Sequence, residues 1–301
     1  PAYVLTDIKE GYPMSNEILD WSVIDYKSTV EHLLQQRGSK FRGTVMEDSY
    51  RGKSGAAVNQ IGAVTAELQT TRHADTPLIE TPHDKRWVFP STYRWADLID
   101  DTDKLKVIAD PTSPYAINGA MSIGRAMDDA IVTAATATSL TGEDGTTSTA
   151  FPSAQTATTT AGGLTVAKLR EAKQLFIAAE VDVDNEPLYC AIGAQQHDDL
   201  LGETQAISLD FTNKPVLVDG RIKSFMGFNF IDSQRLALSG TDRTVVTWAK
   251  SGLHLGIWND LNVNITERAD KNYSTQVFVK ATFGATRVEE KKVVAITCSE
   301  A

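Results

Sequence analysis

Residues 41–90 read FRGTVMEDSYRGKSGAAVNQIGAVTAELQTTRHADTPLIETPHDKRWVFP. Glycine and proline interrupt this segment throughout, and few large apolar side chains occur before Trp87. Short stretches at 63–68 and at Leu78-Ile79 predict strands, and a glycine-rich turn is expected near 50–55. A compact domain seldom carries so long a segment that cannot bury itself. We therefore expect either disorder or an extended hairpin that buries its surface against another molecule.

The chain before this segment predicts an arm and one helix. Residues 1–20 mix Gly11, Pro13 and scattered polar side chains, which is typical of an arm without a core of its own. Apolar side chains then recur at approximately helical spacing over 16–36, and Gly38 marks the expected end of that helix.

A second, longer helix is expected to begin at Ser113-Pro114, with serine as the N-cap and proline in the first helical position. Apolar side chains at steps of three or four define one face of this helix. On the other face, Arg125 and Asp129 predict an i,i+4 ion pair. A helix of about 25 residues would be roughly 38 Å long, so we expect it to form the spine of the fold.

The rest of the chain mixes helices and strands. Residues 138–163 are rich in Thr, Gly and Ser and predict a flexible surface loop. Helices are expected at 165–179 and 194–201, on either side of a buried strand at 188–192. Further strands are expected at 245–248, 253–258, 263–266, 276–283 and 292–298. This order predicts an α+β fold that ends in an antiparallel β layer and contains no βαβ nucleotide-binding unit.

Composition and charge narrow the function classes. The 301 residues are 42% hydrophobic and 23% charged, as in an ordinary folded protein. The net charge is −10 and no basic cluster occurs, which argues against a protein whose task is to grip DNA. No apolar run approaches the roughly 18 residues of a membrane span, and no secretory signal is expected. Cys190 and Cys298 belong to no CxxC pair, so we expect two reduced, buried side chains.

One stretch resembles part of a phosphate-binding loop. Arg51-Gly52-Lys53-Ser54-Gly55 contains the GKS end of that motif, but Glu47 stands where its first glycine belongs. Gly55 and Gly62 also disfavour the helix that must follow the motif. We interpret the stretch as the tip of a hairpin.

Two acidic stretches carry carboxylates that could bind a metal ion. The stretch 182–186 is similar to the start of a calcium loop, but Pro187 and Gly193 replace the required glycine and glutamate. We interpret it as a polar turn. Asp97, Asp100, Asp101 and Asp103 precede Lys104 and Lys106, and this pattern favours a solvated, salt-bridged face. We expect no metal and no cofactor.

Evidence for catalysis is thin. The five histidines form no HExxH motif, and the chain has no GxSxG elbow. His197-Asp198-Asp199 is the one local cluster of histidine and carboxylates, and we expect it on the surface of a short helix. We expect no catalytic residue. A hydrolase with a non-local site around His197 and Asp198 is kept as an alternative.

The order of elements and several local stretches resemble the major capsid proteins of tailed bacteriophages that share the Hong Kong-type shell fold. The resemblance covers about 20–298. The stretches that carry it are Trp87 to Ala130, with WADLID at 95–100 and GRAMDDA at 124–130, Gln195 to Leu201, FMGF at 225–228 and FGATRVEE at 283–290.

The resemblance implies a division of the chain. An N-terminal arm and its helix would occupy 1–36, and an extended loop 37–95. A peripheral domain, with the spine helix and a long antiparallel sheet, would comprise 96–140 and 245–301. An axial domain would occupy 164–244, with the flexible loop at 141–163.

The resemblance also implies partners. In that family the extended loop laps over an adjacent subunit, and copies form hexamers and pentamers of an icosahedral head around double-stranded DNA, which they contact non-specifically. It implies a virion protein assembled in the host cytoplasm with a portal, a separate scaffolding protein and, in some members, a decoration protein, but with no membrane. An encapsulin-like nanocompartment that encloses an enzyme is the second hypothesis.

Charged side chains of the extended loop are the candidate inter-subunit contacts under this hypothesis: Arg51, Lys53, Arg72, Asp75, Asp84 and Arg86. Some family members cross-link a loop lysine to an asparagine of a neighbour. Lys53 would be that lysine, with Asn259, Asn262 or Asn272 as its acceptor, although no feature favours this over an ordinary ion pair.

Overall fold

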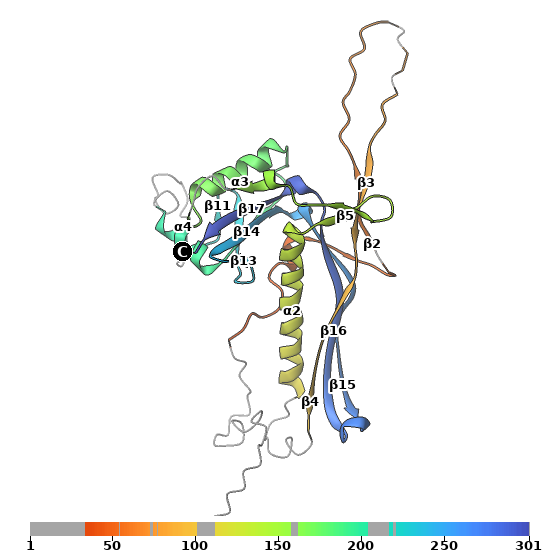
Figure 1. The fold of residues 1–301 in the computed structure, drawn as a ribbon, viewed down its shortest axis with the longest axis vertical. Helices are drawn as coiled ribbons and strands as arrows, with labels where there is room; N and C mark the ends of the chain where they lie inside the picture. The colour runs from red at the N-terminus through yellow and green to blue at the C-terminus, as the bar shows by residue number, and fades with distance from the viewer. Residues whose placement is uncertain are drawn as a thin grey trace, which may run out of the picture.

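The spine of the molecule is one long helix beside a sheet of long strands (Figure 1). The computed structural model describes residues 34–53, 55–72, 75–76, 78–100, 112–157, 162–203, 217–218 and 221–300. The expected arm and nearly all of the expected helix at 16–36 lie outside these residues. No described helix is both long enough and apolar enough to cross a membrane.

Helix α2 (Thr112–Thr136) confirms the predicted spine. Its buried face presents Ile123, Met127 and Ile131 to a sheet with the order β1-β15-β16-β4. The bounds of these strands are β1 (Met46–Ser49), β4 (Ser91–Ile99), β15 (Leu253–Arg268) and β16 (Ser274–Arg287). The helix lies close to the sheet because Gly119 has no side chain: an added Cβ would lie 2.7 Å from a methyl group of Val279.

Strand β15 joins two strands that the sequence predicts separately. Its pairing with β16 slips between Ile257 and Asn262, and the strand continues on both sides of this irregularity. A β-bulge absorbs extra residues without ending a ladder. The polar interval that separates the two predicted strands is therefore a bulged region of one long strand.

A second sheet forms the wider part of the molecule, with the order β11-β12-β8-β14-β17-β7 and β13 beside β14. Helix α3 (Val166–Ala178), capped by the Thr165 side chain, and helix α4 (Ala194–Gly202) confirm the predicted helices. The bounds of the strands are β7 (Thr156–Ala157), β8 (Leu188–Ile192), β11 (Ser224–Phe225), β12 (Phe228–Asp232), β13 (Leu238–Ser239), β14 (Asp242–Ala249) and β17 (Val293–Ser299). A two-stranded ribbon of β9 (Leu217–Val218) and β10 (Arg221–Ile222) lies nearby in the sequence.

This second sheet corrects two expectations. It contains parallel pairs, β12 with β8 and β17 with β7, so the C-terminal layer is not purely antiparallel. Strands β14 and β17 also pair within this sheet, so the expected boundary between 164–244 and 245–301 cuts through a single hydrogen-bonded layer. Cys190 and Cys298 are both buried here, as predicted, and burial raises the pKa of Cys298 to about 11.

A third sheet carries the hairpin, with the order β2-β3-β5-β6. Strands β2 (Gly55–Ile61) and β3 (His83–Val88) pair antiparallel, and the chain between them projects far beyond the body (Figure 1). The strands expected at 63–68 and 78–79 are absent, because the described residues there pair with nothing in their own chain. Residues 41–49 instead belong to the body. Phe41 is fully buried against Trp248, and β1 pairs with β15.

The Thr-rich stretch at 138–163 is not simply a loop. It contains β5 (Ser139–Thr141), β6 (Thr147–Thr149) and β7, and β5 pairs with β3 at the base of the hairpin. Threonine is β-branched and favours strands, so the composition that predicts flexibility also permits these short ladders.

Candidate subunit-contact site

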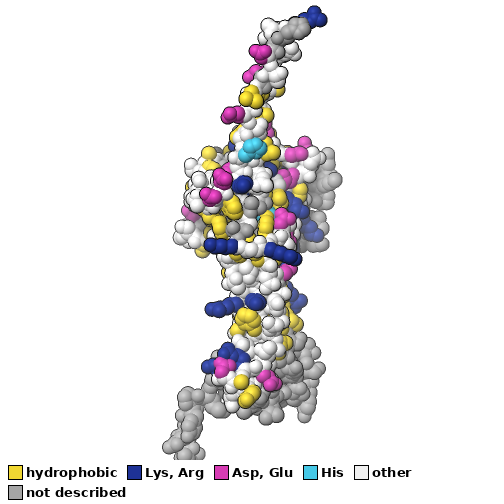
Figure 2. All heavy atoms as spheres, turned by 90° about the vertical axis from the view of Figure 1, so that its right-hand side faces the viewer, with side chains coloured by type: hydrophobic (Ala, Val, Ile, Leu, Met, Phe, Trp, Pro, Cys, Tyr) yellow, Lys and Arg dark blue, Asp and Glu magenta, His cyan; other side chains and the backbone are white. Residues whose placement is uncertain are grey.

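The projecting hairpin is the most exposed apolar part of the described chain. Leu68 and Leu78 are 87% and 93% exposed, and Ile61 and Val64 are also exposed. Figure 2 shows hydrophobic side chains, among acidic and other ones, on a narrow column that stands clear of the body. Isolated exposed leucines are ordinary, but a series of them on one projecting element marks a surface made for a partner.

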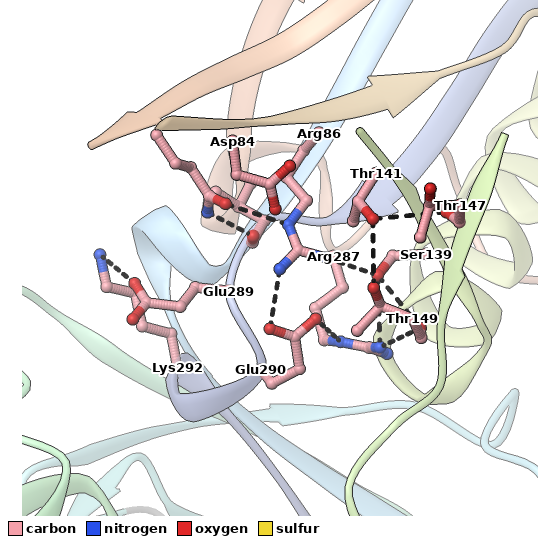
Figure 3. A network of polar contacts seen from close by, with 12 residues as sticks. Asp84, Arg86, Ser139, Thr141, Thr147, Thr149, Arg287, Glu289, Glu290 and Lys292 are labelled. Atoms are coloured by element: carbon pink, nitrogen blue, oxygen red, sulfur yellow. Dashed lines mark hydrogen bonds and ion pairs between the residues drawn. The ribbon is translucent and has the colours of Figure 1, made fainter. Parts of the chain in front are cut away.

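The base of the hairpin is held by buried charges (Figure 3). Arg86 on β3 donates from Nη2 to Glu290 Oε2 at 2.9 Å, from Nη1 to Ser139 Oγ at 3.0 Å and from Nε to Gln60 Oε1 at 3.2 Å. These partners come from β2, from β5 and from the segment after β16. One side chain on β3 thus contacts the other strand of the hairpin and joins the hairpin to two further parts of the chain.

A second buried guanidinium continues this network to the spine. Arg287 is fully buried, and its Nη1 donates to the backbone oxygens of Ala135 and Ala137 at 3.1 and 2.6 Å, at the end of α2. Its Nε lies 3.8 Å from Glu290 Oε1. Burial lowers the pKa of Arg287, and the Glu290 carboxylate opposes that shift. Glu290 therefore faces both buried cations, and the angle of the hairpin is fixed relative to the spine.

The GRAMDDA stretch at 124–130 holds another part of the chain in place against α2. The buried carboxylate of Asp128 accepts hydrogen bonds from the backbone N–H groups of Lys40 and Phe41 at 3.0 to 3.2 Å, and from the side chains of Gln36 and Ser39. An added Cβ on Gly124 would lie 2.6 Å from the Gly38 backbone. Helix α2 thus anchors the chain just before it enters β1.

The ion pair predicted between Arg125 and Asp129 is wrong. Arg125 donates to Gln35 Oε1 at 2.7 Å, and Asp129 pairs with Arg235. Both side chains have partners outside their helix, which spacing along one helix does not reveal.

The structure separates the candidate contact residues into two groups. Arg51, Lys53, Arg72 and Asp75 are exposed, and none forms an ion pair with another described residue. Asp84 Oδ1 accepts from the backbone N–H of Gly142 at 3.2 Å.

Arg86 does not fit the expectation of a contact across subunits. It is 6% exposed and its donors are used within its own chain. Its charge made Arg86 a candidate contact residue in the sequence, and the sequence did not reveal that its side chain is buried.

The alternative catalytic site does not assemble. His197 Nε2 accepts from the Ile222 backbone N–H at 3.3 Å, and Asp199 caps the backbone N–H of Leu164 at 2.9 Å, while Asp198 is exposed. No described residues group as three or more metal-binding side chains. A cavity of about 320 Å³ between α2, β4 and β16 is lined by Tyr93, Thr133 and Phe283 among others, and His197 is not among its lining residues.

The 182–186 stretch is a turn, as interpreted. The 51–55 stretch is not the tip of a hairpin, because it lies between β1 and β2, which belong to different sheets. Strand β2 begins at Gly55, where a phosphate-binding loop would begin a helix. In the 182–186 stretch, Asp182 accepts from both the backbone and the side chain of Asn185. These hydrogen bonds lower the pKa of Asp182 and make the stretch a closed polar turn.

The comparison with known families decides the class of protein. The model of the family described as phage capsid protein matches residues 18–300. The chain belongs to this phage capsid protein family. A search of curated protein sequences gave no match.

Solved structures agree with the family match. The capsid protein of cyanophage P-SCSP1u superposes with a TM-score of 0.67 at 16% identity, over 96% of each chain. The mature capsid of bacteriophage PhiM1 gives 0.67 at 12% identity, over 98% of this chain and 100% of that one. The capsid of a native GTA particle gives 0.65 at 11% identity, over 96% and 99%. The capsid protein therefore has the Hong Kong-type shell fold.

The capsid protein is accordingly a structural subunit, a major capsid protein and not an enzyme. The nanocompartment hypothesis is not favoured, because the matching family and structures are capsids. Sequence reasoning missed Asp128, Arg287 and Glu290 as the residues that fix the hairpin and its approach. All three lie in the stretches GRAMDDA and FGATRVEE, which carried the resemblance without revealing their contacts.

Proposed function

We propose that this capsid protein assembles into hexamers and pentamers of an icosahedral head around double-stranded DNA, and that its hairpin laps over a neighbouring copy. The single observation that carries the proposal is the projecting hairpin, which exposes Ile61, Val64, Leu68 and Leu78 along its length and is held by buried charges at its base. A projecting element with exposed apolar side chains is suited to a contact between copies. Heterologous contacts of this kind close into rings and shells, and many modest contacts act together.

Arg51, Lys53, Arg72, Asp75 and Asp84 remain the proposed charged contacts of the extended loop at 37–95. The first four have no ion-pair partner among the described residues, so each is available to a neighbour. Lys53 is exposed and retains its proposed role as a cross-linking residue, with Asn259, Asn262 or Asn272 of a neighbour.

The further partners are proposed from the family. They are a portal, a separate scaffolding protein and a decoration protein, with assembly in the host cytoplasm. The net charge of −10 supports a wall that contacts packaged DNA only weakly and without sequence preference.

Shortening the hairpin tests this function. Replacing residues 63–81 with Asn-Gly preserves β2, β3 and the Gly62 N–H to Pro82 oxygen bond of 2.8 Å. We expect a subunit with wild-type circular dichroism and melting temperature that forms no particles in electron micrographs. Thr70→Ser, in the same exposed segment, is the matched control and should assemble normally. Normal particles from the shortened protein would contradict the lapping hairpin, and a 33 kDa wild-type monomer at every concentration would contradict the shell itself.

A further inference from the structure

Among the described residues, the part of β15 that follows Ile257 has a free edge. Strand β1 pairs with β15 only from His254 to Ile257, and Tyr50 adds one more bond to the Ile257 oxygen. Beyond that point no other described strand pairs with this side of β15, although the strand continues to Arg268. An exposed edge presents a row of unpaired N–H and C=O groups and is a ready template for a strand of another chain.

This free edge carries an apolar row. Val263 and Ile265 pair directly with Val279 and Val277, which are fully buried under α2. Paired residues share a face of the sheet, so the row extends the buried face sideways, beyond the cover of the helix. Leu261, Val263 and Ile265 are 44%, 40% and 49% exposed.

Apart from the bulge between Ile257 and Asn262, the edge lacks the usual protection against strand addition. Residues 261–266 read LNVNIT, with no charge and no proline. Natural edge strands are commonly guarded by lysine, proline or inward-pointing charges. A short uncharged segment of β-favouring residues is typical of a strand that does become paired.

The hairpin contains a matching segment that lacks a partner. Residues 63–68 read AVTAEL, which predicts a strand, yet they lie in no sheet of their own chain. In an extended backbone, Val64, Ala66 and Leu68 share one face, and all three are exposed. Each segment thus offers three apolar side chains at alternate positions, with polar side chains between them.

We infer that residues 63–68 of one copy add as a strand to the free edge of β15, at 261–266, in a neighbouring copy. This rests on the proposed shell function and names the surface that the hairpin would occupy. The occupant is a second copy because the family is that of a shell protein and the complementary segment lies on the chain itself. The added strand would continue the row of Val277 and Val279 and would shelter the apolar side chains of both segments.

A cysteine pair tests the inference without assuming the direction of the added strand. When the added strand sets Val64, Ala66 and Leu68 opposite the apolar side chains at 261, 263 and 265, Ala66 lies opposite Val263 in both a parallel and an antiparallel register. Particles of the Ala66→Cys, Val263→Cys double variant should therefore form disulfides under mild oxidant and run as covalent multimers on a non-reducing gel. The native Cys190 and Cys298 are buried and have raised pKa values, so they can stay in place.

The matched control is Thr65→Cys with Val263→Cys. Its first cysteine points to the opposite face of the added strand, where Cβ vectors that point apart cannot be bridged. We expect this variant to remain monomeric on the same gel. Intact particles of the Ala66 and Val263 variant without covalent multimers would overturn the inference and leave the shell function standing. Absence of wild-type particles would instead contradict the shell function.

Hydrogen exchange of the wild-type protein gives a second test should the double variant fail to assemble. Backbone amides in 63–68, and those amides in 261–266 that point away from β16, should exchange fast in free subunits and become protected in particles. Fast exchange of either segment within intact particles would overturn the inference.

Discussion

Single residues in this capsid protein act by collecting contacts from distant parts of the chain. Asp128 is the clearest case, because a fully buried carboxylate would be costly without the donors that surround it. Those donors come from residues 36–41, far away in the sequence. A negative side chain on α2 therefore determines where residues 36–41 lie against the spine helix before the chain enters β1.

Replacing Asp128 with alanine should lower the free energy of unfolding by about 2–4 kcal/mol, since the buried N–H groups of Lys40 and Phe41 lose a charged acceptor. Asp129→Ala is the matched control. It breaks a partly exposed pair with Arg235 and should cost about 1 kcal/mol or less. Urea unfolding of the dilute subunit measures both, and equal losses would contradict the anchoring role of Asp128.

His254 predicts a dependence of stability on pH. It is buried in β15, with Nε2 2.9 Å from the Tyr50 hydroxyl and Nδ1 3.9 Å from Asp48. Burial lowers its pKa below the ordinary value of 6.5, and the nearby Asp48 carboxylate only partly opposes this. The unfolded chain therefore takes up a proton below about pH 6.5 that the folded chain does not accept, so stability falls as the pH falls.

The test compares urea unfolding at pH 7.5 and pH 5.5. His254→Gln should lose less stability than wild type over this interval, whereas His83→Gln, which changes an exposed histidine, should behave like wild type. An unchanged pH dependence in His254→Gln would refute the assignment.

At the scale of elements, the base of the hairpin is a junction of three segments rather than a simple turn. Strand β3 pairs with both β2 and β5, and Glu290 lies between the guanidinium groups of Arg86 and Arg287. A buried pair adds little net stability by its presence, but removal of one partner leaves an uncompensated charge. The Glu290 carboxylate is the partner of two buried cations, Arg86 and Arg287.

Glu290→Gln should therefore lower the free energy of unfolding by about 3–5 kcal/mol. The adjacent Glu289→Gln, which breaks a more exposed pair with Lys292 at 3.4 Å, should cost about 1 kcal/mol or less. Chemical denaturation of the two variants under identical conditions makes the comparison. Losses of the same size would show that the network at the hairpin base is not the source of the effect.

The elements also show which sequence patterns were informative. Periodicity located α2, α3 and α4, because a helix on a core must repeat its apolar face every three or four residues. It divided β15 into two strands because a bulge breaks the alternation. Thr-rich composition concealed β5 and β6. The strand prediction at 63–68 was made from side chains alone, and no described strand of the same chain pairs with this segment.

At the scale of the whole molecule, the α+β class and the long hairpin were predictable, but the division into domains was not. The shortage of apolar side chains showed that part of 41–90 could not bury itself. It did not show that Phe41 and Val45 would join the core, or that β14 and β17 would pair with β8. Such pairings depend on contacts between residues far apart in the chain, and a single sequence does not contain them.

The attachment of β3 to β5, and of Arg287 to the last turn of α2, has a mechanical consequence. A force applied at the tip of the hairpin acts on a long lever, and its fulcrum is the buried cluster of Arg86, Glu290 and Arg287. The resulting torque reaches the spine through the pairing of β3 with β5 and the two backbone oxygens that Arg287 binds, in addition to apolar packing. A load that a neighbouring copy applies to the hairpin would therefore tilt helix α2 and not only bend the hairpin.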